Sequence, residues 1–215
     1  MFDMDGLLLD TELVHKKAFI DTCGHFSINK DPSFFDRLIG LDKKKSRILL
    51  EGFLEDQISL EAFETLWIDI FRGRTANGAP VKAGVKDLLC HLNQENLPCA
   101  VATSSRYESA KRHLENAELF GFFQTVTGGD QVSDGKPAPE IYLTAAATLS
   151  VSPEKCIAFE DSENGVRSAV SAGMTVVQVP DLLMPSEELK SLNHLITETI
   201  IDGAMHYGLY PRALS

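Results

Sequence analysis

The chain has 215 residues, and its 44% hydrophobic and 24% charged residues are ordinary for a globular protein with one large domain or a core and a smaller partner. Its net charge of −11, from 20 Lys and Arg against 31 Asp and Glu, would repel a phosphate backbone, so we expect no nucleic-acid partner. A small anionic substrate is still compatible with this charge if a metal and a few cations reverse its sign locally.

The sequence opens on a strand-like stub that carries two aspartates, in the stretch Phe2-Asp3-Met4-Asp5-Gly6. In a strand Asp3 and Asp5 point the same way, so their carboxylates are crowded together. Like charges this close repel unless a cation or a shared proton separates them, so the pair either binds a metal or titrates at two separate pKa values. An Asp-Gly pair also marks a solvated turn, and the pair alone leaves that alternative open.

Residues 11–79 contain no convincing strand but several helical stretches. The expected helices are Glu12–Cys23, Pro32–Ile39, Lys43–Phe53 and Leu60–Phe71, the last three capped by Asp31, Asp42 and Ser59. We therefore expect a helical cap domain at 11–79, joined to the rest of the chain by linkers at Gly6–Thr11 and Arg74–Val81.

From about Val81 onward, short apolar runs alternate with longer helical patterns. The expected strands are Cys99–Thr103, Gln124–Thr127, Cys156–Glu160 and Thr175–Val179. The expected helices are Gly84–Gln94, Tyr107–Ala117, Pro139–Leu149 and Asn164–Ala172. This alternation predicts an α/β fold, a Rossmann-like doubly wound parallel sheet built from residues 1–10 and 80–215, with ligands bound beyond the carboxyl ends of its strands.

The location of the protein is expected to be cytoplasmic. The four cysteines have no C-x-x-C spacing and lie among apolar residues, as reduced core thiols do. No apolar run of 18 residues is present, so we expect no membrane contact, and Asp3 and Asp5 interrupt the region where a signal peptide would be apolar.

Polar residues follow the predicted strands where each strand ends. Thr103, Ser104 and Ser105 close one strand, Glu160 and Asp161 close another, and Lys136 lies in the loop between the third and fourth. A parallel sheet brings such positions to one edge. Each also has a plainer interpretation, because Ser, Thr and Asp cap helices and a loop lysine is commonly solvated.

Their chemistry fits phosphate and a metal ion. The carboxylates of Asp3 and Asp161, with the backbone carbonyl of Asp5, are hard oxygen ligands that suit Mg²⁺. Thr103 offers a hydroxyl, and the turn around Ser104 offers backbone N–H groups, to a phosphate oxygen. Lys136 would add a cation among the acids.

These stretches resemble the four motifs of the haloacid dehalogenase-like hydrolases, in the branch that carries a helical cap and contains phosphatases and phosphomutases. In chain order the similar stretches are Phe2–Glu12, Ala102–Ser105, Lys136–Tyr142, and Phe159–Gly165 with Ala172–Met174. Four motifs in the right order and at the right intervals span essentially the whole chain, and chance agreement is negligible.

The resemblance implies a role for each motif residue. Asp3 would be the nucleophile that forms an aspartyl-phosphate, and Asp5 the acid that protonates the leaving oxygen and then activates water. Thr103 and Lys136 would complete the catalytic set and hold the phosphoryl oxygens. Mg²⁺ would be bound by residues of the first and fourth motifs, namely Asp3, Asp5, Glu160 and Asp161. Dehalogenases lack the second acid, so Asp5 favours phosphoryl chemistry.

Further residues are expected to contact the substrate. The second motif would contribute Ser104 and Ser105, the next residue Arg106 would also contact the substrate, and the cap would act as a lid. His15 matches a cap histidine that the mutases of the family place near the acid, although it could equally be a helix-surface histidine. Lys43 falls where these mutases carry an arginine that grips a second phosphate.

The resulting hypothesis is a phosphoric monoester hydrolase, a Mg²⁺-dependent phosphatase for small phosphorylated metabolites such as sugar phosphates, with a monomer favoured. A phosphomutase is the first alternative, weakened because Phe63–Trp67 offers no counterpart of a further cap lysine. A catalytically silent binder of phosphorylated ligands is the second. Only Met1 and Phe2 precede Asp3, so we expect an unusually short first strand. Three alternatives follow from this: the native chain begins further upstream, other residues supply the strand, or the protein is less stable.

Overall fold

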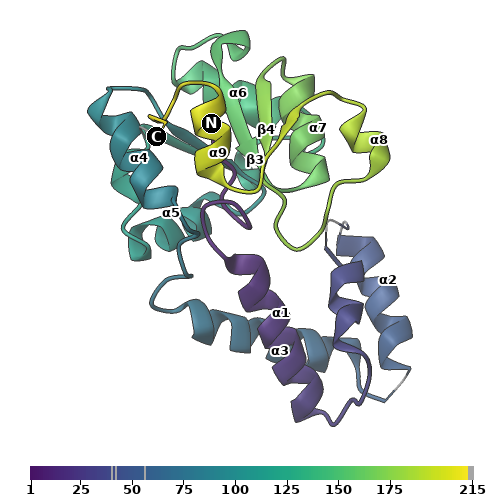
Figure 1. The fold of residues 1–215 in the computed structure, drawn as a ribbon. Coiled ribbons are helices and arrows are strands. Elements are labelled where there is room, and N and C mark those ends of the chain that lie inside the picture. The colour runs from purple at the N-terminus through teal and green to yellow at the C-terminus, as the bar shows by residue number, and fades with distance from the viewer. Residues whose placement is uncertain (40, 42, 56, 213–215) are drawn as a thin grey trace.

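The structure is a computed structural model that describes residues 1–39, 41, 43–55 and 57–212, with Lys43 described by its backbone only. A parallel sheet flanked by helices forms one part of the molecule, and a group of helices from the first third of the chain lies beside its edge (Figure 1). The α/β fold class expected from the sequence is therefore confirmed.

The helices and strands follow the expected order. The strands are β1 (Ala100–Thr103), β2 (Thr125–Gly128), β3 (Ile157–Glu160), β4 (Thr175–Gln178) and β5 (Leu195–Ile196). The α-helices are α1 (Thr11–His25), α2 (Lys43–Leu54), α3 (Leu60–Thr75), α4 (Val85–Gln94), α5 (Tyr107–Asn116), α6 (Glu140–Thr148), α7 (Glu163–Ser171), α8 (Glu187–Lys190) and α9 (Ile200–His206). The 3-10 helices are η1 (Pro32–Arg37), η2 (Phe120–Phe122), η3 (Gly129–Gln131) and η4 (Pro153–Lys155).

Residues 1–3 lie in the middle of the sheet. On one side β1 pairs in parallel with β2, and on the other β3 pairs with β4 and β4 with β5. Phe2 forms parallel bridges to both Val101 of β1 and Phe159 of β3, which joins the two halves. The strand order is therefore β2, β1, residues 1–3, β3, β4, β5.

The pairing of residues 1–3 is complete enough to hold Asp3 in place. The Phe2 amide donates to the Ala100 carbonyl at 2.8 Å, and the Phe2 carbonyl accepts from the Ala102 amide at 2.9 Å. On the other side the Asp3 amide donates to the Phe159 carbonyl at 3.0 Å. The first strand is as short as expected, yet it bonds both neighbours and fixes Asp3 at their carboxyl ends.

The two faces of the sheet are covered by different helices because successive strand residues point to opposite sides. Val101 faces a cluster that contains buried residues of α4, α5 and α9. Its neighbours Ala100 and Ala102 face a cluster that contains buried residues of α6 and α7. Both faces are thus apolar and covered, as expected for a doubly wound sheet.

Residues 11–75 pack around an aromatic core of their own. Phe19 of α1 lies at the centre, with its ring centroid 5.5 Å from that of Phe63 and 5.4 Å from that of Trp67 in α3. The side chains of Asp31 and Ser59 cap η1 and α3 as expected. Asp42, the expected cap of α2, lies outside the described residues. This separate core supports the proposed division into a cap at 11–79 and a sheet domain at 1–10 and 80–215.

The two linkers between these parts run side by side. The Asp10 amide donates to the Pro80 carbonyl at 2.8 Å, and the Lys82 amide donates to the Leu8 carbonyl at 3.0 Å. A third contact comes from the loop after β4, whose Leu182 packs against the aromatic core of the cap. No helix among the described residues is long and apolar enough to cross a membrane.

Candidate active site

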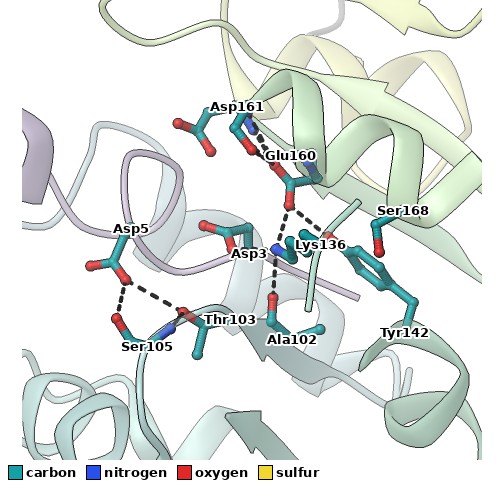
Figure 2. A network of polar contacts seen from close by, with 12 residues as sticks. Asp3, Asp5, Ala102, Thr103, Ser105, Lys136, Tyr142, Glu160, Asp161 and Ser168 are labelled. Atoms are coloured by element: carbon teal, nitrogen blue, oxygen red, sulfur yellow. Dashed lines mark hydrogen bonds and ion pairs between the residues drawn. The ribbon is translucent and has the colours of Figure 1, made fainter. Parts of the chain in front are cut away.

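Side chains from four segments converge at the carboxyl edge of the sheet. They come from residues 3–5, the end of β1, the loop before α6 and the end of β3 (Figure 2). They line a cavity of about 610 Å³. Its lining from the sheet domain is Asp3, Asp5, Thr103, Ser104, Lys136, Pro137, Asp161, Ser162 and Asn164, and its lining from the cap is Glu12, Ile39, Leu41 and Lys45. The cavity therefore lies between the sheet edge and the cap.

Lys136 is the cation at the centre of the acids. Its Nζ donates to Asp3 Oδ1 at 2.6 Å, to Glu160 Oε1 at 2.5 Å and to the Ala102 carbonyl at 3.0 Å (Figure 2). Burial alone would lower the pKa of Lys136, but Asp3 and Glu160 outweigh it and hold that pKa well above its usual value. The ammonium is therefore charged and fixed between two carboxylates.

Glu160 is held by protein donors on both of its oxygens. Oε1 accepts from Lys136 and from the Tyr142 hydroxyl, the latter at 2.9 Å. Oε2 accepts from the amides of Asp161 and Ser162, both at 3.1 Å, and from the Ser162 hydroxyl at 3.0 Å. These contacts favour a role in positioning Lys136, and the predicted role of Glu160 as a metal ligand stays a prediction. Tyr142 belongs to the third motif, but no pattern in the sequence indicated a role for it.

Asp3 lies against Lys136 in a buried position, with 5% of its surface exposed. Burial raises its pKa to about 8, Lys136 opposes that shift, and Glu160 and Asp5 add to it. Without further positive charge, much of the Asp3 carboxyl would be protonated at neutral pH, and a protonated carboxyl is a poor nucleophile. A second cation next to Asp3 would correct this.

Asp161 has room for that cation. Its Oδ1 is buried and has no hydrogen-bond partner among the described residues. Burial, followed by the charges of Glu160, Asp3 and Glu12, raises its pKa well above the usual value. An unpartnered carboxylate oxygen in an acidic setting is what a bound cation would satisfy.

The oxygen donors at this site suit Mg²⁺, which needs few protein ligands, better than a metal that is bound entirely by protein side chains. Among the described residues, no group of three or more His, Cys, Asp or Glu side chains is arranged to hold a metal. Mg²⁺ commonly takes only one or two carboxylates and completes its shell with water and substrate phosphate. Asp3, Asp161 and the carbonyl of Asp5 match that requirement.

Asp5 has a different environment from Asp3. Its Oδ2 accepts from the Ser105 hydroxyl at 2.7 Å and from the Thr103 hydroxyl at 3.4 Å (Figure 2). Thr103 in turn accepts from the Ser105 amide at 3.1 Å. One aspartate thus faces an ammonium and the other faces two hydroxyls, which separates their chemical roles.

The other residues predicted to contact the substrate do not all lie at the active-site cavity. Ser104 lines the cavity, whereas Ser105 is placed as a partner of Asp5. The side chain of Arg106 is 84% exposed, lies 3.6 Å from Asp130 and is not part of the cavity lining. The side chain of Lys43 lies outside the described residues, so its predicted role stays a prediction.

His15 is neither a free surface group nor a lining residue of this cavity. Its ring stacks on Phe71 with the centroids 3.6 Å apart. Burial lowers its pKa to about 4, with Asp5 opposing and His113 adding to the shift, so the ring is neutral at physiological pH. The predicted position of His15 near the acid stays a prediction.

Gly6 keeps open the space between the first loop and Asp161. Its φ is +87°, and a Cβ there would lie 2.2 Å from Asp161 Oδ2. We expect Gly6→Ala to displace that carboxylate, with a backbone strain of about 1–3 kcal/mol, and to weaken Mg²⁺ binding. The measurement is the rise in melting temperature on adding Mg²⁺.

The matched control for this substitution is Gly135→Ala, in the loop that carries Lys136. Apart from its chain neighbours, no described residue has an atom within 4 Å of a Cβ at Gly135, so the Mg²⁺ response should match that of the unsubstituted protein. An equal Mg²⁺ response in Gly6→Ala would show that Asp161 does not bind the ion.

An α/β sheet with a lysine set among acids at its carboxyl edge, facing a helical cap, defines a capped hydrolase. The chain belongs to the haloacid dehalogenase-like hydrolases, whose family model matches residues 1–179. The family and hydrolase class expected from the sequence are confirmed.

Similar proteins agree with this assignment. The phosphorylated carbohydrates phosphatase of Thermotoga maritima is 33% identical over 174 residues, which cover 81% of each chain. The β-phosphoglucomutase of Bacillus subtilis is 32% identical over 186 residues, which cover 83% of this chain and 81% of that protein. The crystal structure of CbbY from Rhodobacter sphaeroides in complex with phosphate has a TM-score of 0.70 at 26% identity and 92% coverage of each chain. Several of the relatives are phosphatases, which agrees with the expected class of phosphoric monoester hydrolase.

Proposed function

We propose that this protein is a Mg²⁺-dependent phosphatase of small phosphorylated metabolites, such as sugar phosphates, acting through an aspartyl-phosphate on Asp3. The observation that carries the proposal is the charged Lys136 between Asp3 and Glu160, beside the unpartnered oxygen of Asp161. This arrangement offers a nucleophile, a fixed cation and a cation site in one cavity.

The residues divide the reaction between them. Asp3 attacks phosphorus, while Lys136 and the Thr103 hydroxyl hold phosphoryl oxygens on which transition-state charge is spread. Asp5, held by Ser105 and Thr103, protonates the leaving oxygen and then takes a proton from the water that cleaves the aspartyl-phosphate. Mg²⁺ on Asp3, Asp161 and the Asp5 carbonyl would supply positive charge that keeps Asp3 ionised and neutralises the phosphate.

The cap makes the phosphatase a better proposal than the phosphomutase. A mutase must hold a second phosphate on the leaving group, and the stretch Phe63–Trp67 contributes its aromatic rings to the cap core. The presence of a β-phosphoglucomutase among the relatives keeps the mutase as the second candidate. A monomeric state, a cytoplasmic location and the absence of a nucleic-acid partner remain our proposals.

The test is a panel of p-nitrophenyl phosphate and phosphorylated metabolites, assayed with and without Mg²⁺. Phosphate release that requires Mg²⁺ supports the proposal. Isomerisation of a hexose 1-phosphate that outpaces phosphate release would favour the mutase. Tight ligand binding without turnover would favour the silent binder.

Mg²⁺ should stabilise the protein more strongly as pH rises. In the metal-free protein burial raises the pKa of Asp3 to about 8 and that of Glu12 to about 7, whereas unfolded carboxyls titrate near 4. The folded state therefore binds more protons than the unfolded state across this range, so the free energy of unfolding falls as pH rises. Mg²⁺ binds the ionised carboxylates and opposes the loss.

The measurement is the melting temperature with EDTA and with Mg²⁺ between about pH 5.5 and pH 8.5. We expect the gap between the two conditions to widen by several degrees toward high pH. Asp161→Asn, which removes one ionisable ligand, should reduce that widening. A gap that does not change with pH would contradict the prediction.

A further inference from the structure

A second cavity lies at the junction of the cap and the sheet domain and is lined by residues of both. Its volume is about 560 Å³, and it shares no lining residue with the active-site cavity. His15 comes from α1, Arg72 from α3 of the cap, and Arg112 and His113 from α5 of the sheet domain. The cavity therefore spans the junction between the two parts of the molecule.

The polar lining of this cavity is basic or neutral. It contains two arginines, two histidines and the hydroxyl residues Thr75 and Ser109, and none of the described residues that line it is Asp or Glu. In a chain of net charge −11, a cavity with this lining is unusual. The charge of this lining is opposite in sign to that of the active-site cavity, whose lining includes four carboxylates.

Arg112 of α5 contributes a guanidinium to the lining of this cavity. Within the described part of the chain its guanidinium makes no ion pair or hydrogen bond. Among the described residues, the Arg72 guanidinium makes only a long contact, at 3.9 Å to Asp69 on the same helix. A guanidinium offers five N–H donors in a planar fork that suits phosphate and carboxylate oxygens.

The two histidines leave further polar atoms unsatisfied. His113 is 8% exposed, and its Nδ1 is buried without a hydrogen-bond partner among the described residues. The Nδ1 of His15 is likewise buried without a hydrogen-bond partner among the described residues. Buried polar atoms without partners destabilise a protein unless something satisfies them, and an anion in the cavity could accept from a ring N–H.

We propose that this cavity is a second binding site for an oxyanion, either inorganic phosphate or the phosphoryl group of a larger molecule. Arg112 and Arg72 supply the charge, and His113 supplies a buried donor. Because Arg72 belongs to the cap and Arg112 to the sheet domain, a bound oxyanion ties one part to the other. One polar contact already joins these elements, since Asn116 Nδ2 donates to the Ala76 carbonyl at 3.2 Å.

The test is calorimetric titration of the full chain with inorganic phosphate in EDTA, so that Mg²⁺ does not contribute a phosphate site. We expect Arg112→Gln to weaken binding about tenfold or more, because a charge-assisted contact is lost. The matched control is Lys111→Gln, which removes the same charge from the next position of α5, outside the cavity lining. Lys111→Gln and the active-site variant Thr103→Val should both bind phosphate as the unsubstituted protein does.

A parallel titration with phenylphosphonate, which cannot be hydrolysed, distinguishes the source of the oxyanion. Tighter binding of phosphate points to the free ion, and tighter binding of the phosphonate points to the group of a larger molecule. Three results would overturn the site. They are an equal phosphate affinity in Arg112→Gln and the unsubstituted protein, a loss of phosphate binding in Thr103→Val, and no phosphate binding by the unsubstituted protein. An unchanged affinity in Arg72→Gln would overturn the tie between cap and sheet domain. Hydrolysis is not measured, so the outcome is independent of the proposed phosphatase activity.

Discussion

Replacing Asp3 with Asn is expected to lower the rate of phosphate-ester hydrolysis on the order of 10⁴-fold or more, because the attacking oxygen is lost. The fold should survive, since Asn has the shape of the protonated carboxyl that burial favours at this position. Lys136 also keeps its contacts with Glu160 and the Ala102 carbonyl. The measurements are Mg²⁺-dependent hydrolysis of p-nitrophenyl phosphate and the melting temperature.

The control for Asp3→Asn is Asp134→Asn, the same chemical change at an exposed position two residues before Lys136. We expect its hydrolysis rate to stay within a factor of two or so of the unsubstituted protein, because the Asp134 side chain does not line the cavity. Substantial turnover by Asp3→Asn would rule out the aspartyl-phosphate mechanism proposed above.

Replacing Lys136 with Met is expected to remove activity and to destabilise the fold by about 3–5 kcal/mol. The reason is that Glu160 is fully buried and Asp3 nearly so, and both would lose their cation. The measurement is the free energy of unfolding by denaturant, taken together with the hydrolysis rate. Lys155→Met, at an exposed position in η4, serves as the control and should leave both unchanged.

A double variant separates charge from catalysis. Adding Glu160→Gln to Lys136→Met removes the largest uncompensated charge, and the Gln side chain can still accept from the amides of Asp161 and Ser162. Stability should recover in large part, while activity should not. If Lys136→Met alone is as stable as the unsubstituted protein, the lysine does not hold this cluster together.

The sequence predicted most of the sheet because buried strands leave a strong local signal. The apolar run Cys99–Thr103 contains β1, and Thr175–Val179 contains β4, each within one residue of its ends. In contrast, β5 has two half-buried residues and exists through its pairing with β4. The short helices α8 and α9 were not predicted either, since four and seven residues give too little periodicity.

The sequence predicted which residues gather at the site, but it did not predict most of the hydrogen bonds between them. The convergence of Asp3, Lys136 and Asp161 follows from strand order, and strand order follows from the alternating pattern. One hydrogen bond to Glu160 comes from the hydroxyl of Tyr142 in α6, and no local sequence pattern reveals that contact. Likewise the helix after β3 is capped by Ser162, which leaves Asp161 available for other contacts.

The central position of residues 1–3 has a consequence for folding. Phe2 and Asp3 pair with neighbours about 100 and 157 residues further along the chain, so these contacts close very long loops and form slowly. During synthesis, residues 1–3 emerge well before β1 and β3 exist, and until both strands have formed they expose apolar surface without their full set of native partners. The proposed nucleophile, Asp3, therefore reaches its place in the site only when the two halves of the sheet meet, and we expect a nascent chain that ends before Glu160 to be inactive.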